Sequence, residues 1–278
     1  MNAPVKNKVY LAALTLAVSS NLTLAQSQSP IQSAARPYAL DIIDTVKVAG
    51  SDASSANFQS NILPGMLEAI NLNLSESSSV NDLSSISLDP GKLVLGYDSN
   101  IRVYFLGEGA GYRNSLGFST TGGTPLSADA SLIFPDASAN TGYGGNGTTT
   151  RSSSAPLLAG DFVDLGSFTS GTSLDFFLIA NGATGGKQFF STTQTANSDG
   201  IVHAVSLAQN GSAYLIIGFE DVLKGGDKDY NDLVFAVEIG RKNVEHLVRL
   251  SAPEPSLAIG SALAGMALFG MRRRRNRC

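Results

Sequence analysis

The chain has 278 residues, of which 15% are charged, and its formal net charge is −4. Its one cysteine is Cys278, the last residue, so a folded body built from this sequence holds no disulfide bond. Because His203 and His246 are the only histidines, a zinc or copper centre is not expected either.

Residues 1–25 have the layout of a secretory signal peptide. Lys6 and Lys8 supply the positive region, residues 9–18 form a short apolar core, and small residues precede a cleavage site after Ala25. The apolar core is too short to span a bilayer comfortably. The sequence therefore predicts that the protein is exported.

Residues 26–90 are expected to form an N-terminal extension of the folded body. The segment is polar and rich in Ser and Ala, and its one apolar run, residues 38–48, predicts an early strand. Residues 62–74 predict a short helix that begins near Pro64. Residues 75–87 have the composition of a loop.

Residues 91–250 show the pattern of an all-β domain. Short apolar runs alternate with turn residues at close intervals, which predicts an antiparallel β-sandwich or jelly-roll-like domain. A long stretch of loop composition, residues 136–156, interrupts the pattern. The expected strands are residues 92–97, 101–106, 115–120, 130–134, 162–165, 173–180, 188–191, 201–207, 213–219 and 233–239.

An acidic segment joins the last two expected strands. It holds five carboxylates against two lysines, so its charge repulsion must be offset by a hard cation or by many backbone N–H groups. Three of its oxygen-bearing side chains alternate along the chain, as in the first half of an EF-hand loop. We expect a calcium site formed by Asp227, Asp229, Asn231 and Asp232, with Glu220 or Asp221 assisting.

Two alternatives to a strand-borne calcium loop stay open. A true EF-hand is disfavoured, because Asp232 stands where that loop has an invariant Gly and both flanks have strand character, although Glu238 falls at the position of the closing Glu. A hairpin whose Asp and Asn side chains accept bonds from backbone N–H groups would also explain the composition.

Three segments of the body resemble the domain-of-unknown-function 4114 family. They are residues 105–117 (FLGEGAGYRNSLG), residues 176–182 (FFLIANG) and residues 218–235, which include the run GGDKDYNDLVF. The resemblance covers residues 95–240 and implies a β-rich domain of exported bacterial proteins. It implies no established activity, so no catalytic residue follows from it.

The C-terminal end, residues 253–278, has three parts in a fixed order. The tripeptide Pro253, Glu254, Pro255 precedes an uncharged run, residues 256–271, and a basic cluster follows it, Arg272, Arg273, Arg274 and Arg275. As a helix, the run extends roughly 24 Å, and snorkelling arginines can complete the span of a bilayer. It is the expected transmembrane helix, with the basic cluster as the cytoplasmic stop-transfer signal.

This ending resembles the PEP-CTERM sorting signal of Gram-negative bacteria. The resemblance implies export by the secretion machinery, an inner-membrane-anchored precursor and processing by exosortase. It also implies a final location at the cell surface or in the extracellular matrix, together with exopolysaccharide and biofilm. A plain C-terminal anchor would share the topology without using Pro253, Glu254 and Pro255.

Charge and side-chain chemistry narrow the function of the exported body. The two ends hold seven of the 19 basic residues and one of the 23 acidic ones, so the body is strongly acidic and nucleic acid is not an expected partner. The chain has no Gly-x-Ser-x-Gly elbow and no Trp, so we do not expect an enzyme. We expect a calcium-stabilised structural or adhesive protein of the biofilm matrix. A calcium-dependent carbohydrate-binding module is the alternative, and a polysaccharide hydrolase is the weaker one.

Overall fold

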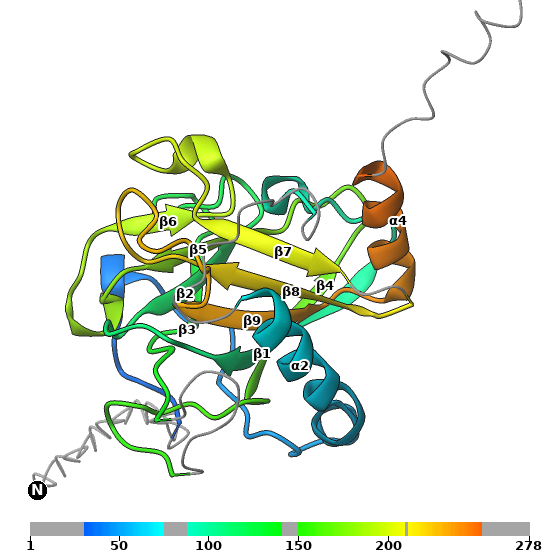
Figure 1. Cartoon of the computed structure of the whole chain (residues 1–278), viewed down its shortest axis with the longest axis horizontal. Coiled ribbons are helices and arrows are strands. Elements are labelled where there is room, and N and C mark those ends of the chain that lie inside the picture. The colour runs from blue at the N-terminus through cyan, green and yellow to red at the C-terminus, as the bar shows by residue number, and fades with distance from the viewer. Residues whose placement is uncertain (1–30, 75–87, 141–149, 209–210, 252–278) are drawn as a thin grey trace, which may run out of the picture.

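The computed structural model describes residues 31–74, 88–140, 150–208 and 211–251, and these form nine strands in two antiparallel sheets (Figure 1). The five-stranded sheet has the order β4-β1-β9-β8-β7, and the four-stranded sheet has the order β3-β2-β5-β6. The strands are β1 (Ser99–Gly107), β2 (Ser115–Ser119), β3 (Ser131–Phe134), β4 (Phe162–Phe168), β5 (Asp175–Ile179), β6 (Phe189–Ser191), β7 (Ala204–Ala208), β8 (Tyr214–Phe219) and β9 (Leu233–Glu238). The expectation of a body made mainly of antiparallel β-sheet is confirmed.

The two sheets share one apolar core between them. Phe176 of the smaller sheet and Phe235 of the larger one have ring centroids 5.2 Å apart, and Phe105 meets Phe134 at 6.1 Å. These aromatic side chains are fully buried, and such rings bury much apolar area each and hold the sheets together. The sheets therefore form a sandwich-like arrangement.

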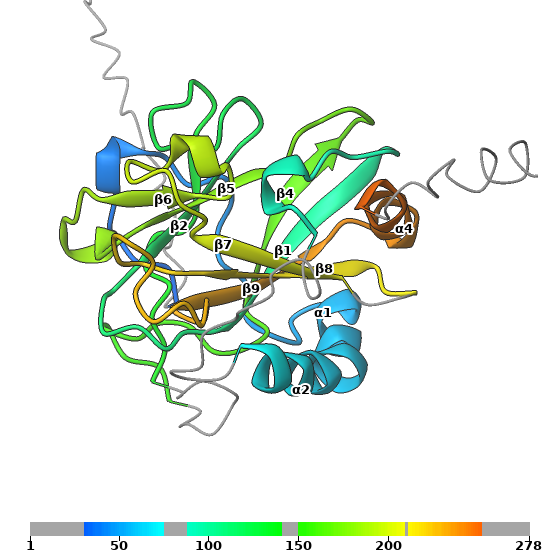
Figure 2. The ribbon, with the colours of Figure 1, turned by 45° about the horizontal axis from the view of Figure 1, so that its top comes forward.

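Helices cover the outer face of the larger sheet (Figure 2). A helical run of α1 (Ala53–Asn57), a π-turn (Phe58–Ile62) and α2 (Leu63–Asn73) packs Phe58 against Tyr104 of β1, with ring centroids 3.8 Å apart. Asp52 caps this run, because its carboxylate accepts a bond from Ser55 N at 2.7 Å. The helix thus begins earlier than the expected residues 62–74.

A second amphipathic helix, α4 (Arg241–Ser251), follows β9 directly and was not expected from the sequence. Val244 and Leu247 face the core, and the buried Asn243 amide donates to Ile239 O at 2.8 Å. The remaining short helices are Pro37–Ala39, Pro90–Lys92, Gly182–Thr184 and Gln194–Ala196.

Two expected strands are wrong. Residues 38–48 pair only through isolated bridges at Ile42 and Lys47, because the segment crosses the edges of the sheets instead of running along one of them. Residues 92–97 likewise make one bridge, from Val94 to Ser173. The other nine expected strands each lie within a few residues of one of β1 to β9.

The predicted signal peptide and the C-terminal sorting signal lie outside the described residues. Within residues 31–251, gaps excepted, we find no helix with the length and apolar character needed to cross a membrane.

Candidate metal centre

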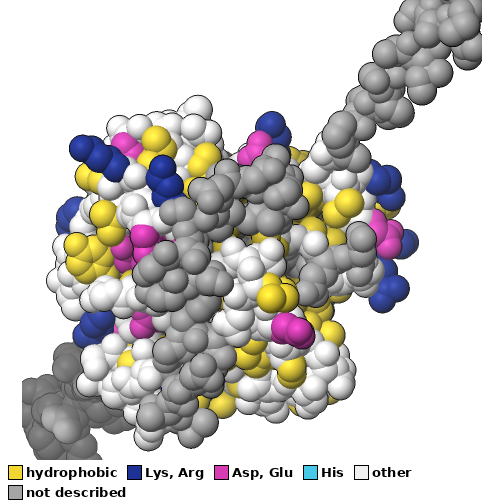
Figure 3. Space-filling model, viewed as in Figure 1, with side chains coloured by type: hydrophobic (Ala, Val, Ile, Leu, Met, Phe, Trp, Pro, Cys, Tyr) yellow, Lys and Arg dark blue, Asp and Glu magenta, His cyan; other side chains and the backbone are white. Residues whose placement is uncertain are grey.

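The acidic segment forms the loop between β8 and β9, residues 220–232, at the opposite end of these strands from α4 (Figure 1). The strands are in register up to the pair Phe219 and Leu233, so both ends of the loop are fixed by the sheet. In the space-filling view, acidic and basic side chains appear on both sides of the molecule (Figure 3). The acidic excess of the loop therefore lies in its own five carboxylates against two lysines.

Three carboxylates of the loop converge. Glu220, Asp227 and Asp229 each offer an oxygen, and these oxygens all lie within 4.8 Å of one another. Ligands on opposite sides of one calcium ion are separated by up to about twice the Ca–O distance of roughly 2.4 Å. The three oxygens are therefore close enough to share one ion. Glu220 and Asp229 are buried, and Asp227 is exposed.

Glu220 is the deepest of the three, with 0% of its surface exposed. Its Oε1 accepts a bond from Tyr230 N at 2.8 Å, but its Oε2 is buried and has no hydrogen-bond partner. A buried carboxylate oxygen without a partner is costly, and either a cation or a proton on this atom would offset that cost. Burial, with help from Asp229 and Asp227, raises the pKa of Glu220 to about 7.

The backbone of the loop gives the alternating side chains their common direction. Lys228 and Tyr230 have φ of 63° and 55°, so each lies in the left-handed region between two oxygen-bearing residues. Asn231 donates from Nδ2 to Asp229 Oδ2 at 2.8 Å, and this bond orients the carboxylate. Asn231 therefore lies beside Asp229, with its amide nitrogen turned toward that carboxylate.

Position 226 must be glycine, because the space next to Glu220 leaves no room for a side chain. The φ of Gly226 is 46°, and a Cβ built on it would lie 2.5 Å from Glu220 Oε2. Any side chain at this position would fill the space in front of the unpartnered oxygen.

Asp221 and Asp232 form a second pair beside this trio. Asp232 Oδ2 accepts a bond from Asp221 N at 2.8 Å, and Asp221 Oδ2 accepts one from Asn114 Nδ2 at 2.7 Å. Burial and the closeness of the two carboxyl groups raise the pKa of Asp232, and burial raises that of Asp221. The six expected ligands are thus grouped as a trio, an orienting Asn231 and a separate carboxyl pair.

Distant segments that the sequence did not point to support the loop. Asp199 accepts a bond from Lys224 N at 2.8 Å and also pairs with the buried His203 at 3.0 Å. Glu108, from the end of β1, lies near Asp221, and burial raises its pKa to about 7. The one signal in the sequence for this contact is that residues 107–114 contain an acid, Glu108, and an amide, Asn114. Arg113, at the same turn, forms an ion pair with Asp136.

This geometry suits calcium better than a transition metal. The donors are carboxylate oxygens, which a hard cation prefers, and neither histidine belongs to the group. Glu238 lies at the far end of β9 and takes no part, so the arrangement differs from an EF-hand.

Comparison with known families concerns the part of the chain that contains this loop. Residues 168–240 match the family described as Domain of unknown function (DUF4114). The matched segment runs from the end of β4 to just beyond the end of β9 and includes the whole acidic loop. No curated protein and no solved structure matches the chain.

Proposed function

We propose that the loop between β8 and β9 binds calcium and that the ion stabilises a jelly-roll-like β-sandwich. The observation that carries this proposal is the unpartnered Glu220 Oε2, which is buried against Asp227 and Asp229. A bound cation would neutralise this carboxylate group and would complete the coordination of the buried oxygen. The role is structural or adhesive, without catalysis.

We also propose that the protein is exported, sorted by exosortase and placed at the cell surface or in a biofilm matrix. This proposal is supported by the residue pattern of the two ends, from Lys6 to Ala25 and from Pro253 to Arg275. A calcium-dependent stabilising site is consistent with it, because extracellular modules bind calcium with Kd of about 10⁻⁴–10⁻³ M.

The test is the thermal unfolding of the full chain with calcium and with EDTA. At 5 mM, calcium is present at about 5–50 times a Kd of about 10⁻³–10⁻⁴ M, which stabilises the folded state by about 1–2.3 kcal/mol. For a folded body of this size, that gain corresponds to a rise in Tm of about 2–9 °C. Asp229→Asn should remove the gain, whereas the exposed α4 variant Glu245→Gln should keep it. An equal Tm with 5 mM calcium and with EDTA would refute the calcium site.

A further inference from the structure

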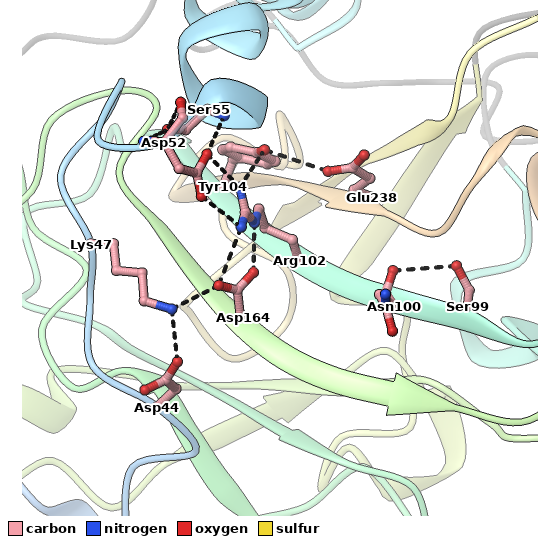
Figure 4. Close-up of polar contacts among 10 residues, drawn as sticks. All are labelled: Asp44, Lys47, Asp52, Ser55, Ser99, Asn100, Arg102, Tyr104, Asp164 and Glu238. Atoms are coloured by element: carbon pink, nitrogen blue, oxygen red, sulfur yellow. Dashed lines mark hydrogen bonds and ion pairs between the residues drawn. The ribbon is translucent and has the colours of Figure 1, made fainter.

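A polar cleft of about 400 Å³ lies on the outer face of the larger sheet, beyond the end of the helical cover. Arg102 of β1 has two cross-strand neighbours, Asp164 of β4 and Glu238 of β9, so three adjacent strands each place one charged side chain on this face. Figure 4 shows Arg102 between these two acids. The volume is within the range of ligand pockets.

The charge network around Arg102 fixes the walls of the cleft. Arg102 Nε donates to Asp164 Oδ1 at 2.6 Å, and Arg102 Nη2 lies 2.9 Å from Asp52 Oδ2. Its guanidinium carbon lies 4.1 Å from the centre of the Phe162 ring, which holds the group flat against the sheet. Lys47 adds a second ion pair to Asp164 at 2.7 Å. The role of Asp52 and Asp164 is therefore structural, because both carboxylates hold the Arg102 guanidinium in place.

Glu238 is not explained by this network. Among the described residues, no Lys or Arg nitrogen lies within 4.0 Å of its carboxylate. Its neighbours are two tyrosines: the Tyr104 hydroxyl donates to its Oε2 at 3.4 Å, and Tyr214, its cross-strand partner on β8, also hydrogen-bonds to it. Glu238 is half-buried and lines the cleft. It therefore keeps acceptor capacity that faces the open space.

A glycine keeps the floor of the cleft open. Gly166 of β4 has φ of 103° and pairs with Ile101 at a bulge of the β1–β4 ladder. A Cβ at Gly166 would have no heavy atom within 4 Å, so the space above it is empty. The exposed Asn100 also lines the cleft and lines a neighbouring one of about 360 Å³ as well. That second cleft adds hydroxyl groups and the ring of the half-buried Phe168.

These features suit a chain of hydroxyl groups. Carboxylate and amide oxygens accept bonds from hydroxyls, Asn100 can also donate, and the accessible edge of the half-buried Phe168 ring can contact a sugar ring. The charged residues that line the two clefts are Asp98, Asp164 and Glu238 against Arg102, so the clefts carry a net negative charge and repel polyanions. We propose that the two clefts joined at Asn100 bind a polysaccharide without acidic groups, independently of calcium.

Affinity electrophoresis of the full chain in EDTA tests this site, with dextran, partially deacetylated chitin and alginate as the polymers in separate gels. We expect dextran or the chitin polymer, but not alginate, to retard the protein. Glu238→Gln and Asn100→Ala should each weaken this binding about tenfold, which corresponds to about 1.4 kcal/mol. Glu245→Gln, a matched change on exposed α4, should leave it unchanged.

Three outcomes would overturn the proposal. They are no retardation by either non-acidic polymer, equal retardation by alginate, and binding that both cleft variants leave unchanged. A parallel gel with calcium in place of EDTA gives a fourth: binding that is seen only there and that Asp229→Asn abolishes would place the saccharide at the β8–β9 loop and would overturn the proposal. Because the other gels contain EDTA, a failed calcium site does not affect the result expected for the cleft.

Discussion

Glu220→Gln should have opposite effects on the calcium-free and the calcium-bound protein. Without calcium, the folded state holds a carboxyl whose pKa is raised by burial from 4.5 to about 7. Because the folded pKa lies above the unfolded one, stability from this group is complete below about pH 4.5 and is lost as the pH rises through 7. Gln has no charge to bury, and its amide can donate to Asp229.

The magnitude follows from the size of this change. A rise of about 2.5 in the pKa corresponds to about 3 kcal/mol at alkaline pH. Water reaches the site from the side of the exposed Asp227, which reduces the effect. Between pH 5 and pH 8.5 in EDTA, we therefore expect the wild-type protein to lose about 1–3 kcal/mol more than Glu220→Gln.

The assay is differential scanning calorimetry of both proteins across this pH range. The variant should melt about 3–9 °C above the wild type at pH 8.5 in EDTA, and calcium should raise only the Tm of the wild type. Glu245→Gln controls for the loss of one surface charge. A variant that melts below the wild type at pH 8.5 in EDTA would show that Glu220 is not a buried, uncompensated carboxylate.

Three further predictions concern the supports of the two sites. Asp164→Asn removes ion pairs to Arg102 and Lys47 and should lower the free energy of unfolding in urea by about 1–3 kcal/mol; a loss below about 0.5 kcal/mol would contradict the network. Gly218→Ala places a Cβ 2.2 Å from Tyr230 O and should lower the free energy of unfolding in urea by about 2 kcal/mol or more. In the control variant Gly107→Ala the new Cβ meets no heavy atom within 4 Å, so this free energy should be nearly unchanged. Burial would raise the pKa of Asp199, but the bonds from the Lys224 N–H and His203 outweigh it and lower that pKa to about 2. The contribution of Asp199 to the free energy of unfolding is therefore lost as the pH falls from about 4 to 2. Asp199→Ala should make the free energy of unfolding less dependent on pH in this range.

Short-range patterns predicted most of the strands and the acidic loop. The runs that became β8 and β9 are continuous apolar segments bounded by turn residues, and such segments form buried strands wherever they pair. Residues 38–48 have the same apolar character, but no strand edge runs alongside them, so they make bridges only. The α4 helix carried a readable signal in the spacing of Val244 and Leu247, next to the left-handed Gly240.

The partners of both sites could not be predicted in this way, because the contacts join residues that are far apart in the chain. Asn114 reaches Asp221 across 107 positions, and Arg102 reaches Asp164 across 62. The local pattern of apolar and polar residues does not predict which turn of one sheet will contact which loop of the other sheet. The sequence can therefore predict an acidic loop, whereas the division of its carboxylates between a trio and a pair depends on the packing of the two sheets.

The division of the carboxylates sets the affinity that we expect for calcium. Only three carboxylates converge, and one of them, Asp227, is exposed, so water must supply much of the coordination. The nearby Asp221–Asp232 pair adds attraction, but it lies in hydrogen bonds of its own. We therefore expect a Kd of about 10⁻⁴–10⁻³ M, in the range of extracellular modules, measured by isothermal titration calorimetry at pH 7.5. A Kd below about 10⁻⁷ M would require more protein ligands than the trio offers, and it would mean that Asp221 and Asp232 turn toward the ion.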